Sequence, residues 1–247
     1  MASSRLKAEA KLSEIQYVGL RWASHRLAAD REKGARVYDT RMTSVLTGAS
    51  VGQLSNWRSD LASAGALLKP AHRSSTPYLY SFEDVVALRG FVKLRRSTSL
   101  QKIRRAVGYL REMHPDTHLS RQSLRAYPGG ESIVWISDDG EYIDIVEKPG
   151  QLGIKVVMEE IFEAFRTDAG RIVPDLSTPA IGLSIDMHVR GGFPVLAGTR
   201  LPFNAVSSLA RDGLNEAEIR ALYPSATPAG IAGAVSFASL VEANEAA

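Results

Sequence analysis

The spacing of apolar residues predicts helices over most of the first 113 positions. Residues 5–33 follow a helical pattern, with a stop at Gly34. A short helix around Thr43–Thr47 is followed by the turn Gly48-Ala49 and by a second helix from Ser50 to about Ala64. Glycine permits a sharp reversal between helices, and the Ser50 hydroxyl can accept a hydrogen bond from a first-turn amide. The pattern therefore predicts two helices that meet at a tight turn.

A basic segment separates these helices from the next pair. Residues 66–80 contain two prolines, a basic cluster and a closing Tyr-Leu-Tyr, which favours a short two-stranded wing. Ser81 can cap a helix whose apolar stripe runs to Leu94, with Asp84 as the acidic member of a capping box. Another helix is expected from Ser99 to Met113, ending before Pro115.

The pattern changes after residue 118. Residues 119–148 alternate apolar and polar positions in short runs separated by Pro-Gly-Gly and Asp-Asp-Gly, which predicts a small antiparallel sheet. Residues 154–166 predict a helix, or a strand leading into one, and residues 167–184, with Pro174 and Pro179, predict a linker. Three helices are expected at the end, near 203–212, 215–222 and 227–243.

These elements predict an α+β protein that is mainly α, with four regions. They are a helical extension at 1–36, a winged helix-turn-helix at 37–113, a sheet and helix that connects or dimerises at 119–166, and a helical domain at 185–247.

Charge divides the chain more sharply than its total suggests. The formal net charge is only +3, but residues 1–113 hold 20 Lys and Arg against 9 Asp and Glu, whereas residues 114–247 hold 10 against 18. A front part of net +11 favours a polyanionic partner, and a remainder of net −8 favours a different one. Two domains whose compositions drifted apart would give the same asymmetry, and charge alone does not separate DNA from RNA.

Composition excludes several other classes of protein. With no cysteine the chain has no disulfide, thiolate metal site or cysteine nucleophile. No apolar run approaches the roughly 18 residues that span a bilayer, and the polar start has no secretory pattern. We expect a cytoplasmic protein with no membrane partner.

The second helix of the turn has one face suited to reading DNA. Val51, Leu54 and Leu61 are expected to face the core, with Trp57 as a core anchor. The amides of Gln53 and Asn56 can each bond N6 and N7 of an adenine, which makes these residues the candidates for base readout. The full set of candidate DNA contacts is Ser50, Gly52, Gln53, Ser55, Asn56 and Arg58 on the helix, with Lys69, His72 and Arg73 in the wing for phosphates or the minor groove.

The stretch Thr43–Pro70 (TSVLTGASVGQLSNWRSDLASAGALLKP), followed by YLYSFEDVVALRGFVKLR, resembles the MerR-like winged helix-turn-helix family over about 60 residues. The resemblance implies DNA binding. The chain departs from the family at Ser55, where a basic residue is usual, and at Arg58, where an acid is usual. The span from Trp57 to Gly65 is also about one helical turn longer than usual. A helix-turn-helix kept only as a scaffold is the alternative.

The last 60 residues carry a second resemblance. The markers are Arg190-Gly191-Gly192, Pro194-Val195, Ala197-Gly198-Thr199-Arg200-Leu201-Pro202, Asp212-Gly213, Glu218-Ile219 and Tyr223-Pro224. They resemble a small helical domain called DUF433, whose members often occur in, or as, antitoxins of bacterial toxin–antitoxin pairs. The same glycine-rich turns would also serve as purely local structure.

Together the two modules resemble an antitoxin of the VapB type, cognate to a PIN-domain ribonuclease toxin. The resemblance implies a front half that binds double-stranded operator DNA and a remainder that dimerises and blocks the toxin. Because PIN-domain toxins have an acidic RNA site, Arg190 and Arg200 are the tentative toxin-binding residues. One winged domain covers little groove surface, so we expect a homodimer.

No pattern of catalytic residues emerges from the sequence. The five histidines are scattered, Pro115 breaks the helix that would bring His114 and His118 together, and no nucleophile, phosphate-loop or zinc-protease motif occurs. We expect no catalytic residues, no metal site and no cofactor.

The alternative function is a MerR-like effector-sensing transcription regulator whose C-terminal part binds a ligand or only dimerises. The absence of cysteine excludes thiol-based metal sensing, and the helix ending near Met113 is shorter than the dimerising helix of such regulators.

Overall fold

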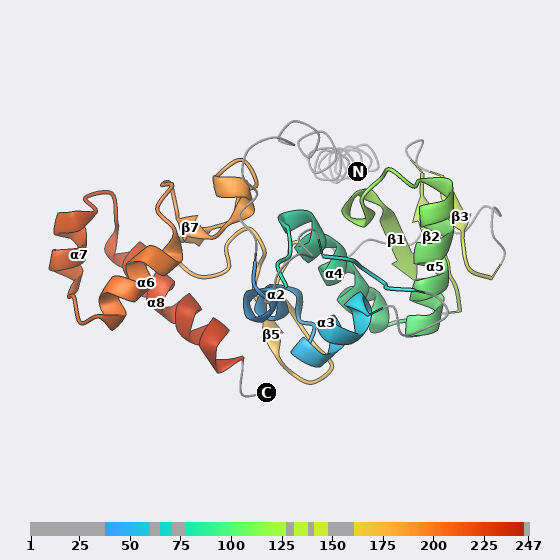
Figure 1. Cartoon of the computed structure of the whole chain (residues 1–247), viewed down its shortest axis with the longest axis horizontal. Coiled ribbons are helices and arrows are strands. Elements are labelled where there is room, and N and C mark those ends of the chain that lie inside the picture. Colours follow the sequence, from blue (N-terminus) through green and yellow to red (C-terminus); the bar gives the residue numbers. More distant parts are fainter. Residues whose placement is uncertain are drawn as a thin grey trace, which may run out of the picture. The chain divides into compact units, whose positions relative to one another are not determined.

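The computed structural model describes residues 38–59, 65–70, 78–126, 131–137, 141–147 and 161–244. The predicted helix at 5–33 and the loop of the predicted wing lie outside these ranges. Within them the chain is mainly helical, with small antiparallel sheets (Figure 1). No helix in the described ranges is long and apolar enough to cross a membrane.

Two short helices joined by a tight turn open the described chain. Helix α2 (Thr40–Thr47) begins earlier than predicted because the Asp39 side chain accepts from the Met42 amide at 2.8 Å and caps it. Gly48 ends α2 at φ 81°, in the left-handed conformation, with its N–H bonded to the Ser44 carbonyl. Helix α3 (Val51–Arg58) then begins at the N-cap Ser50.

Helix α3 is shorter than the sequence predicts. It ends at Arg58 rather than near Ala64, and Ser59 is already extended. The carbonyl of Trp57 accepts from the amides of Leu67 and Leu68, at 2.7 and 3.2 Å, so a neighbouring segment occupies the helix end.

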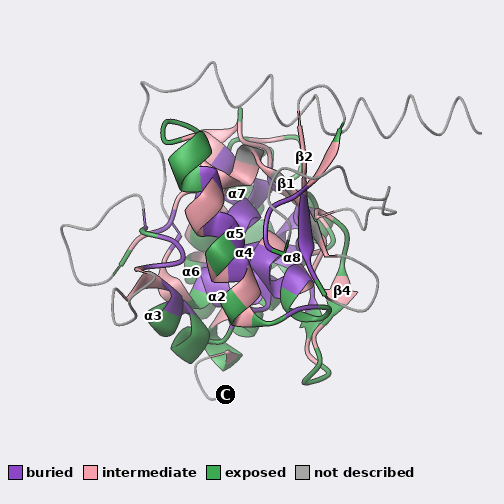
Figure 2. Ribbon diagram, turned by 90° about the vertical axis from the view of Figure 1, so that its right-hand side faces the viewer, coloured by how far each residue is buried: buried purple, intermediate pink, exposed green. Residues whose placement is uncertain are grey.

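Helix α4 (Phe82–Arg95) lies at the centre of the core and is buried along most of its length (Figure 2). Its predicted capping box is present: Ser81 accepts from the Asp84 amide, and the Asp84 carboxylate accepts from the Ser81 amide. It packs against α2, against α5 (Leu100–Met113), against the 3-10 helix η1 (Leu119–Arg121) and against the sheet.

The predicted antiparallel sheet is confirmed. It consists of β1 (Ser123–Ala126), β2 (Ile133–Ile136) and β3 (Tyr142–Asp144) in the order β1-β2-β3. Leu124 lies opposite Trp135, which lies opposite Ile143 on the next strand.

The segment between the sheet and the final helices differs from the prediction. Residues 154–160 lie outside the described ranges, residues 161–164 form turns and bends, and β4 (Phe165–Arg166) pairs with β5 (Ile172–Val173) as a hairpin. The expected linker at 167–184 therefore contains strands: β5, and β6 (Leu183–Ser184), which pairs with β7 (Val195–Leu196) across the 3-10 helix η2 (Arg190–Gly192). Strands this short leave too little alternation to be recognised.

The three predicted C-terminal helices are confirmed as α6 (Phe203–Arg211), α7 (Glu216–Leu222) and α8 (Pro228–Ala243). Helices α6 and α8 pack closely, with Phe203 and Phe237 in an edge-to-face contact at 5.0 Å between ring centroids.

The C-terminal helices contact the front helices directly, and residues 35–247 form a single unit. The Tyr38 hydroxyl donates to the Gly192 carbonyl, and the Tyr38 ring stacks on Phe193. At the far end of α8, the Asn244 side-chain amide donates to the Ser44 hydroxyl at 2.8 Å. In Figure 1 the last turns of α8 accordingly approach α2.

A fully buried arginine connects three parts of the fold. The Arg89 guanidinium, on α4, donates to the carbonyl of Leu46 in α2 and to four carbonyls of the 161–174 segment, namely Ile161, Phe162, Glu163 and Pro174. Burial lowers the pKa of Arg89 to about 10, which leaves it charged at neutral pH. Such a charge is tolerated because carbonyl dipoles surround it.

Candidate nucleic-acid interface

One side of α3 is buried and the other is open to solvent. Leu54 and Trp57 are 1% and 3% exposed, and Trp57 packs edge-on against Phe91 with 6.3 Å between ring centroids. Their predicted core positions are confirmed. The opposite face presents side chains that are small, polar or short: Ser50, Val51, Gly52, Gln53, Ser55 and Asn56 are all exposed.

The prediction that Val51 faces the core is wrong, since Val51 is 42% exposed. Leu54 and Trp57 define the centre of the buried face. At about 100° per residue, Val51 lies roughly 90° away from that centre. Leu61, the third expected core residue of this helix, lies outside the described residues.

Gln53 has a structural contact of its own. Its side-chain oxygen accepts from the backbone N–H of Ser50 at 2.8 Å, and the backbone N–H of Gln53 donates to the Ser50 hydroxyl at 3.1 Å. This is a capping box with glutamine at its third position. While it is closed, Gln53 can offer a base its NH₂ group but not its oxygen.

Asn56 is held in a similar way by a residue that the sequence analysis did not single out. Arg104, on α5, donates to the Asn56 side-chain oxygen at 3.3 Å and to the Gly65 carbonyl at 2.6 Å. Arg111, seven residues further along α5, donates to the carbonyls of Ala66 and Leu67 at 2.7 and 2.8 Å. Arg104 and Arg111 are seven residues apart, which is about two helical turns. This spacing in the sequence indicates that the two arginines share one face of α5.

Arg58, the last residue of α3, is half-buried. It donates to the Tyr80 hydroxyl and to Ser55, each at 3.3 Å, and lies 4.0 Å from the centre of the Tyr78 ring. An arginine stacked on one tyrosine and bonded to another is well placed to hold the segment that carries Tyr78 and Tyr80 against α3.

The structure places the candidate DNA contacts in three groups. Ser50, Gly52, Gln53, Ser55 and Asn56 share the exposed face of α3, Arg58 lies half-buried beside it, and Lys69 is exposed on the segment at residues 65–70. The remaining two candidates, His72 and Arg73, lie outside the described residues.

The tentative toxin-binding residues lie together in the C-terminal part. The Arg190 guanidinium donates to the backbone carbonyl of Arg200 at 3.4 Å, while Arg200 itself is exposed. Among the described residues other than glycine, Arg190 is the one with positive φ, at 54°. It precedes Gly191 and Gly192, so the whole Arg-Gly-Gly motif follows a left-handed path.

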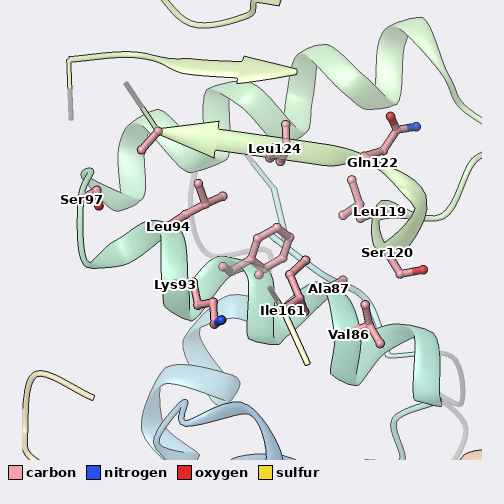
Figure 3. A pocket seen from close by; sticks show the side chains of 13 residues that line it. Val86, Ala87, Lys93, Leu94, Ser97, Leu119, Ser120, Gln122, Leu124 and Ile161 are labelled. Atoms are coloured by element: carbon pink, nitrogen blue, oxygen red, sulfur yellow. The ribbon is translucent and has the colours of Figure 1, made fainter. Parts of the chain in front are cut away.

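A cavity lies between α4 and β1 (Figure 3). Its volume is about 270 Å³. The lining is mainly apolar, including Val86, Ala87, Leu94, Leu119, Leu124 and Ile161, with Lys93, Ser97, Ser120 and Gln122 as its polar members.

Comparison with known proteins identifies one segment. A family model described as "Protein of unknown function (DUF433)" matches residues 183–238, which run from β6 into α8. The DUF433 resemblance of the C-terminal region is thereby confirmed over less than a quarter of the chain. Neither a curated protein nor a solved structure matches.

Proposed function

We propose that the protein is a DNA-binding antitoxin, not an enzyme. As a homodimer it places α3 in the major groove of its operator and represses its own operon, and its C-terminal part binds and neutralises a PIN-domain ribonuclease toxin. The observation that carries the DNA-binding half is the exposed polar face of α3, held at a tight turn by a buried Leu54 and Trp57.

The dimensions and chemistry of α3 support this role. An α helix with its side chains is about 10–12 Å across and fits a major groove about 12 Å wide. The oxygens of Gln53 and Asn56 are engaged within the protein, so the amides present mainly N–H donors. We therefore expect contacts to base acceptors, such as guanine N7 and O6 or thymine O4, rather than two bonds to one adenine.

The test uses the full-length protein and its own promoter fragment. Affinity should fall steeply with salt, because several phosphates are neutralised. Gln53→Ala with Asn56→Ala should reduce the preference for the promoter over unrelated DNA by at least about tenfold, since each lost base contact removes about 1–3 kcal/mol of discrimination.

Gln101→Ala is the control, because Gln101 is exposed on α5 and should leave the preference unchanged. A uniform loss on all DNA would reassign Gln53 and Asn56 to positioning. Failure of the wild type to bind its promoter at low salt would exclude the operator function.

Exposed apolar side chains support a protein partner for the C-terminal part. Of the nine large hydrophobic residues exposed in the described chain, five lie between residues 181 and 240: Ile181, Leu222, Tyr223, Val235 and Leu240. A contiguous exposed apolar patch often marks an interaction site, and these five side chains are the candidates for one. Arg190 and Arg200, in the same part of the sequence, would supply positive charge for an acidic RNA site.

Neutralisation can be tested by co-expressing this chain with the product of the neighbouring gene and assaying that product for ribonuclease activity. Leu222→Ser, at a residue 59% exposed, and Arg200→Ala should each weaken inhibition by about tenfold if they lie in the contact, since most hot-spot truncations cost more than 1 kcal/mol. Met113→Ser is the matched control, because Met113 is 57% exposed but lies on α5. If none of the three changes affects inhibition, the toxin contact does not depend on Leu222 or Arg200. If this chain and the toxin form no complex, the antitoxin function is excluded.

The cavity between α4 and β1 favours a second candidate, the effector-sensing regulator. Ligand pockets are usually about 300–1,000 Å³, so a cavity of about 270 Å³ suits only a small, largely apolar molecule. A screen of small carboxylic acids, chosen for Lys93, would favour this function if one of them raised the melting temperature and changed promoter affinity together.

A further inference from the structure

The β4–β5 hairpin packs directly on the turn that leads into α3. A side-chain carbon built at Gly48 would lie 2.7 Å from the Val173 side chain and 3.1 Å from that of Thr167, so backbone and hairpin are in close contact. Arg171 strengthens the junction: its guanidinium donates to the Gly48 carbonyl and, at 2.6 Å, to the Asn244 side chain. The hairpin is thus fixed relative to the start of α3.

The tip of the hairpin is closed by backbone hydrogen bonds and is exposed. The Thr167 amide donates to the Arg171 carbonyl at 2.9 Å, and the Gly170 amide donates to the Thr167 carbonyl at 2.8 Å. Arg166 and Asp168 are both exposed beside this turn. In Figure 1 β5 and α3 both lie in the lower part of the view, and in Figure 2 α3 lies at the lower left and β4 at the right.

The charge of Arg166 is oriented but not neutralised. Its guanidinium donates to the Gly170 carbonyl at 2.9 Å, which limits its rotation, and it forms no ion pair within the described part of the chain. The hairpin also differs from its surroundings: residues 164–173 hold two arginines and one aspartate, whereas residues 114–247 as a whole have net charge −8.

We propose that the β4–β5 hairpin is a second DNA-contacting element of the same interface, with Arg166 binding a backbone phosphate beside the groove that α3 occupies. The proposal rests on the proposed DNA-binding function and adds a contact site to it. Phosphate is the chemical target because a guanidinium binds it through two N–H groups, and because phosphates flank the major groove on both sides. Asp168 would lie near the same backbone and oppose binding.

The test compares variants of the full-length protein on its promoter fragment over a range of salt concentrations. Arg166→Gln should lower affinity about three- to tenfold near 0.1 M salt and reduce the log–log salt slope by about 1, equally for specific and unrelated DNA. Arg166→Lys should keep most of the affinity. Asp168→Asn should raise affinity, because one repulsive charge is removed.

Arg220→Gln is the matched control, because Arg220 is also exposed but lies on α7 beside Glu216. If Arg166→Gln binds DNA with the same affinity and the same salt slope as Arg220→Gln, the hairpin does not contact DNA. That result would leave the DNA-binding function itself intact. If the wild type does not bind DNA at all, it is the underlying function that fails. An unchanged melting temperature for Arg166→Gln shows that any loss is not due to unfolding.

Discussion

At the scale of single residues, Arg89 is a side chain on which five hydrogen bonds within the described part of the chain depend. It is completely buried, and its guanidinium bonds the carbonyls of five residues in two separate segments. The sequence shows only a charged residue within an apolar helical stripe, where an exposed position would be expected. The carbonyls that Arg89 binds lie more than 40 residues away in the sequence, both before and after it. No local sequence pattern reveals such contacts.

Arg89→Met should therefore lower the free energy of unfolding by about 3 kcal/mol or more, because several buried carbonyls lose their donors. Urea unfolding followed by circular dichroism measures it. Arg105→Met removes an exposed guanidinium that pairs with Glu147 at 3.8 Å and should change stability by less than about 1 kcal/mol. Similar losses for the two variants would contradict the assigned role of Arg89.

Tyr38 predicts a pH dependence. Burial raises the pKa of its hydroxyl above the ordinary value of 10. The unfolded chain therefore releases this proton near pH 10 while the folded chain keeps it, so the stability due to Tyr38 is present below about pH 10 and is lost as pH rises further. Burial also raises the pKa of Tyr80, which adds to the same trend.

Tyr38→Phe should cost about 1–3 kcal/mol near pH 8, because the Gly192 carbonyl loses its donor. The same variant should lose less stability than the wild type between pH 9 and pH 11. Urea midpoints across this range test both effects, with the exposed Tyr223→Phe expected to follow the wild type. If Tyr38→Phe leaves the decrease of stability with pH unchanged, the Tyr38 hydroxyl ionises equally in the folded and the unfolded chain.

At the scale of elements, the turn between α2 and α3 determines where the exposed face of α3 points. Gly48 has φ 81° and lies against the β4–β5 hairpin, so a side chain at this position is opposed both by backbone conformation and by Val173. Gly108, on α5, is helical and has open space around it.

Gly48→Ala should consequently destabilise the protein by about 1–2 kcal/mol or more. Gly108→Ala should stabilise it by about 0.5–1 kcal/mol, because alanine loses less backbone entropy in a helix. Differential scanning calorimetry should show melting temperatures that move in opposite directions. A neutral Gly48→Ala would mean that the turn is not constrained as described.

The elements that could be predicted from sequence are those whose ends are encoded locally. The capping boxes at Ser50, Ser81 and Asn215 mark helix starts within a residue or two of those observed. Turn residues likewise separated the strands of the β1-β2-β3 sheet correctly. The β4–β5 hairpin was missed because its strands have two residues each and are stabilised by packing on Gly48, a contact between distant segments.

The candidate site, too, could be predicted from the sequence only in part. Spacing along α3 correctly placed Leu54 and Trp57 inside and the polar residues outside. It could not show that Gln53 caps its own helix or that Arg104 reaches Asn56, because both depend on which of several possible partners a flexible side chain selects.

At the scale of the whole molecule, the helices of the DUF433 region and the α2–α4 helices share one unit. Tyr38 bonds Gly192 at one end of their contact, and Ser44 accepts from Asn244 at the other. Both are specific polar contacts, and the first lies beside the stacked rings of Tyr38 and Phe193.

Hydrogen exchange should therefore show one opening free energy, within about 1 kcal/mol, for the slowest amides of α4 and of α8. Asn244→Ala should lower both values together. If the amides of α8 exchange by a separate, less costly opening, the two regions unfold independently.

The bond between Asn244 and Ser44 also limits how this protein can be recombined. A chimera that joins residues 183–244, the matched segment with the rest of α8 and Asn244, to an unrelated N-terminal segment would leave the Gly192 carbonyl without its tyrosine and the Asn244 amide without its serine. Transplanting Tyr38 and Ser44, with the surface of α2 that carries them, is the minimum needed for a hybrid to keep the native docking of its C-terminal helices.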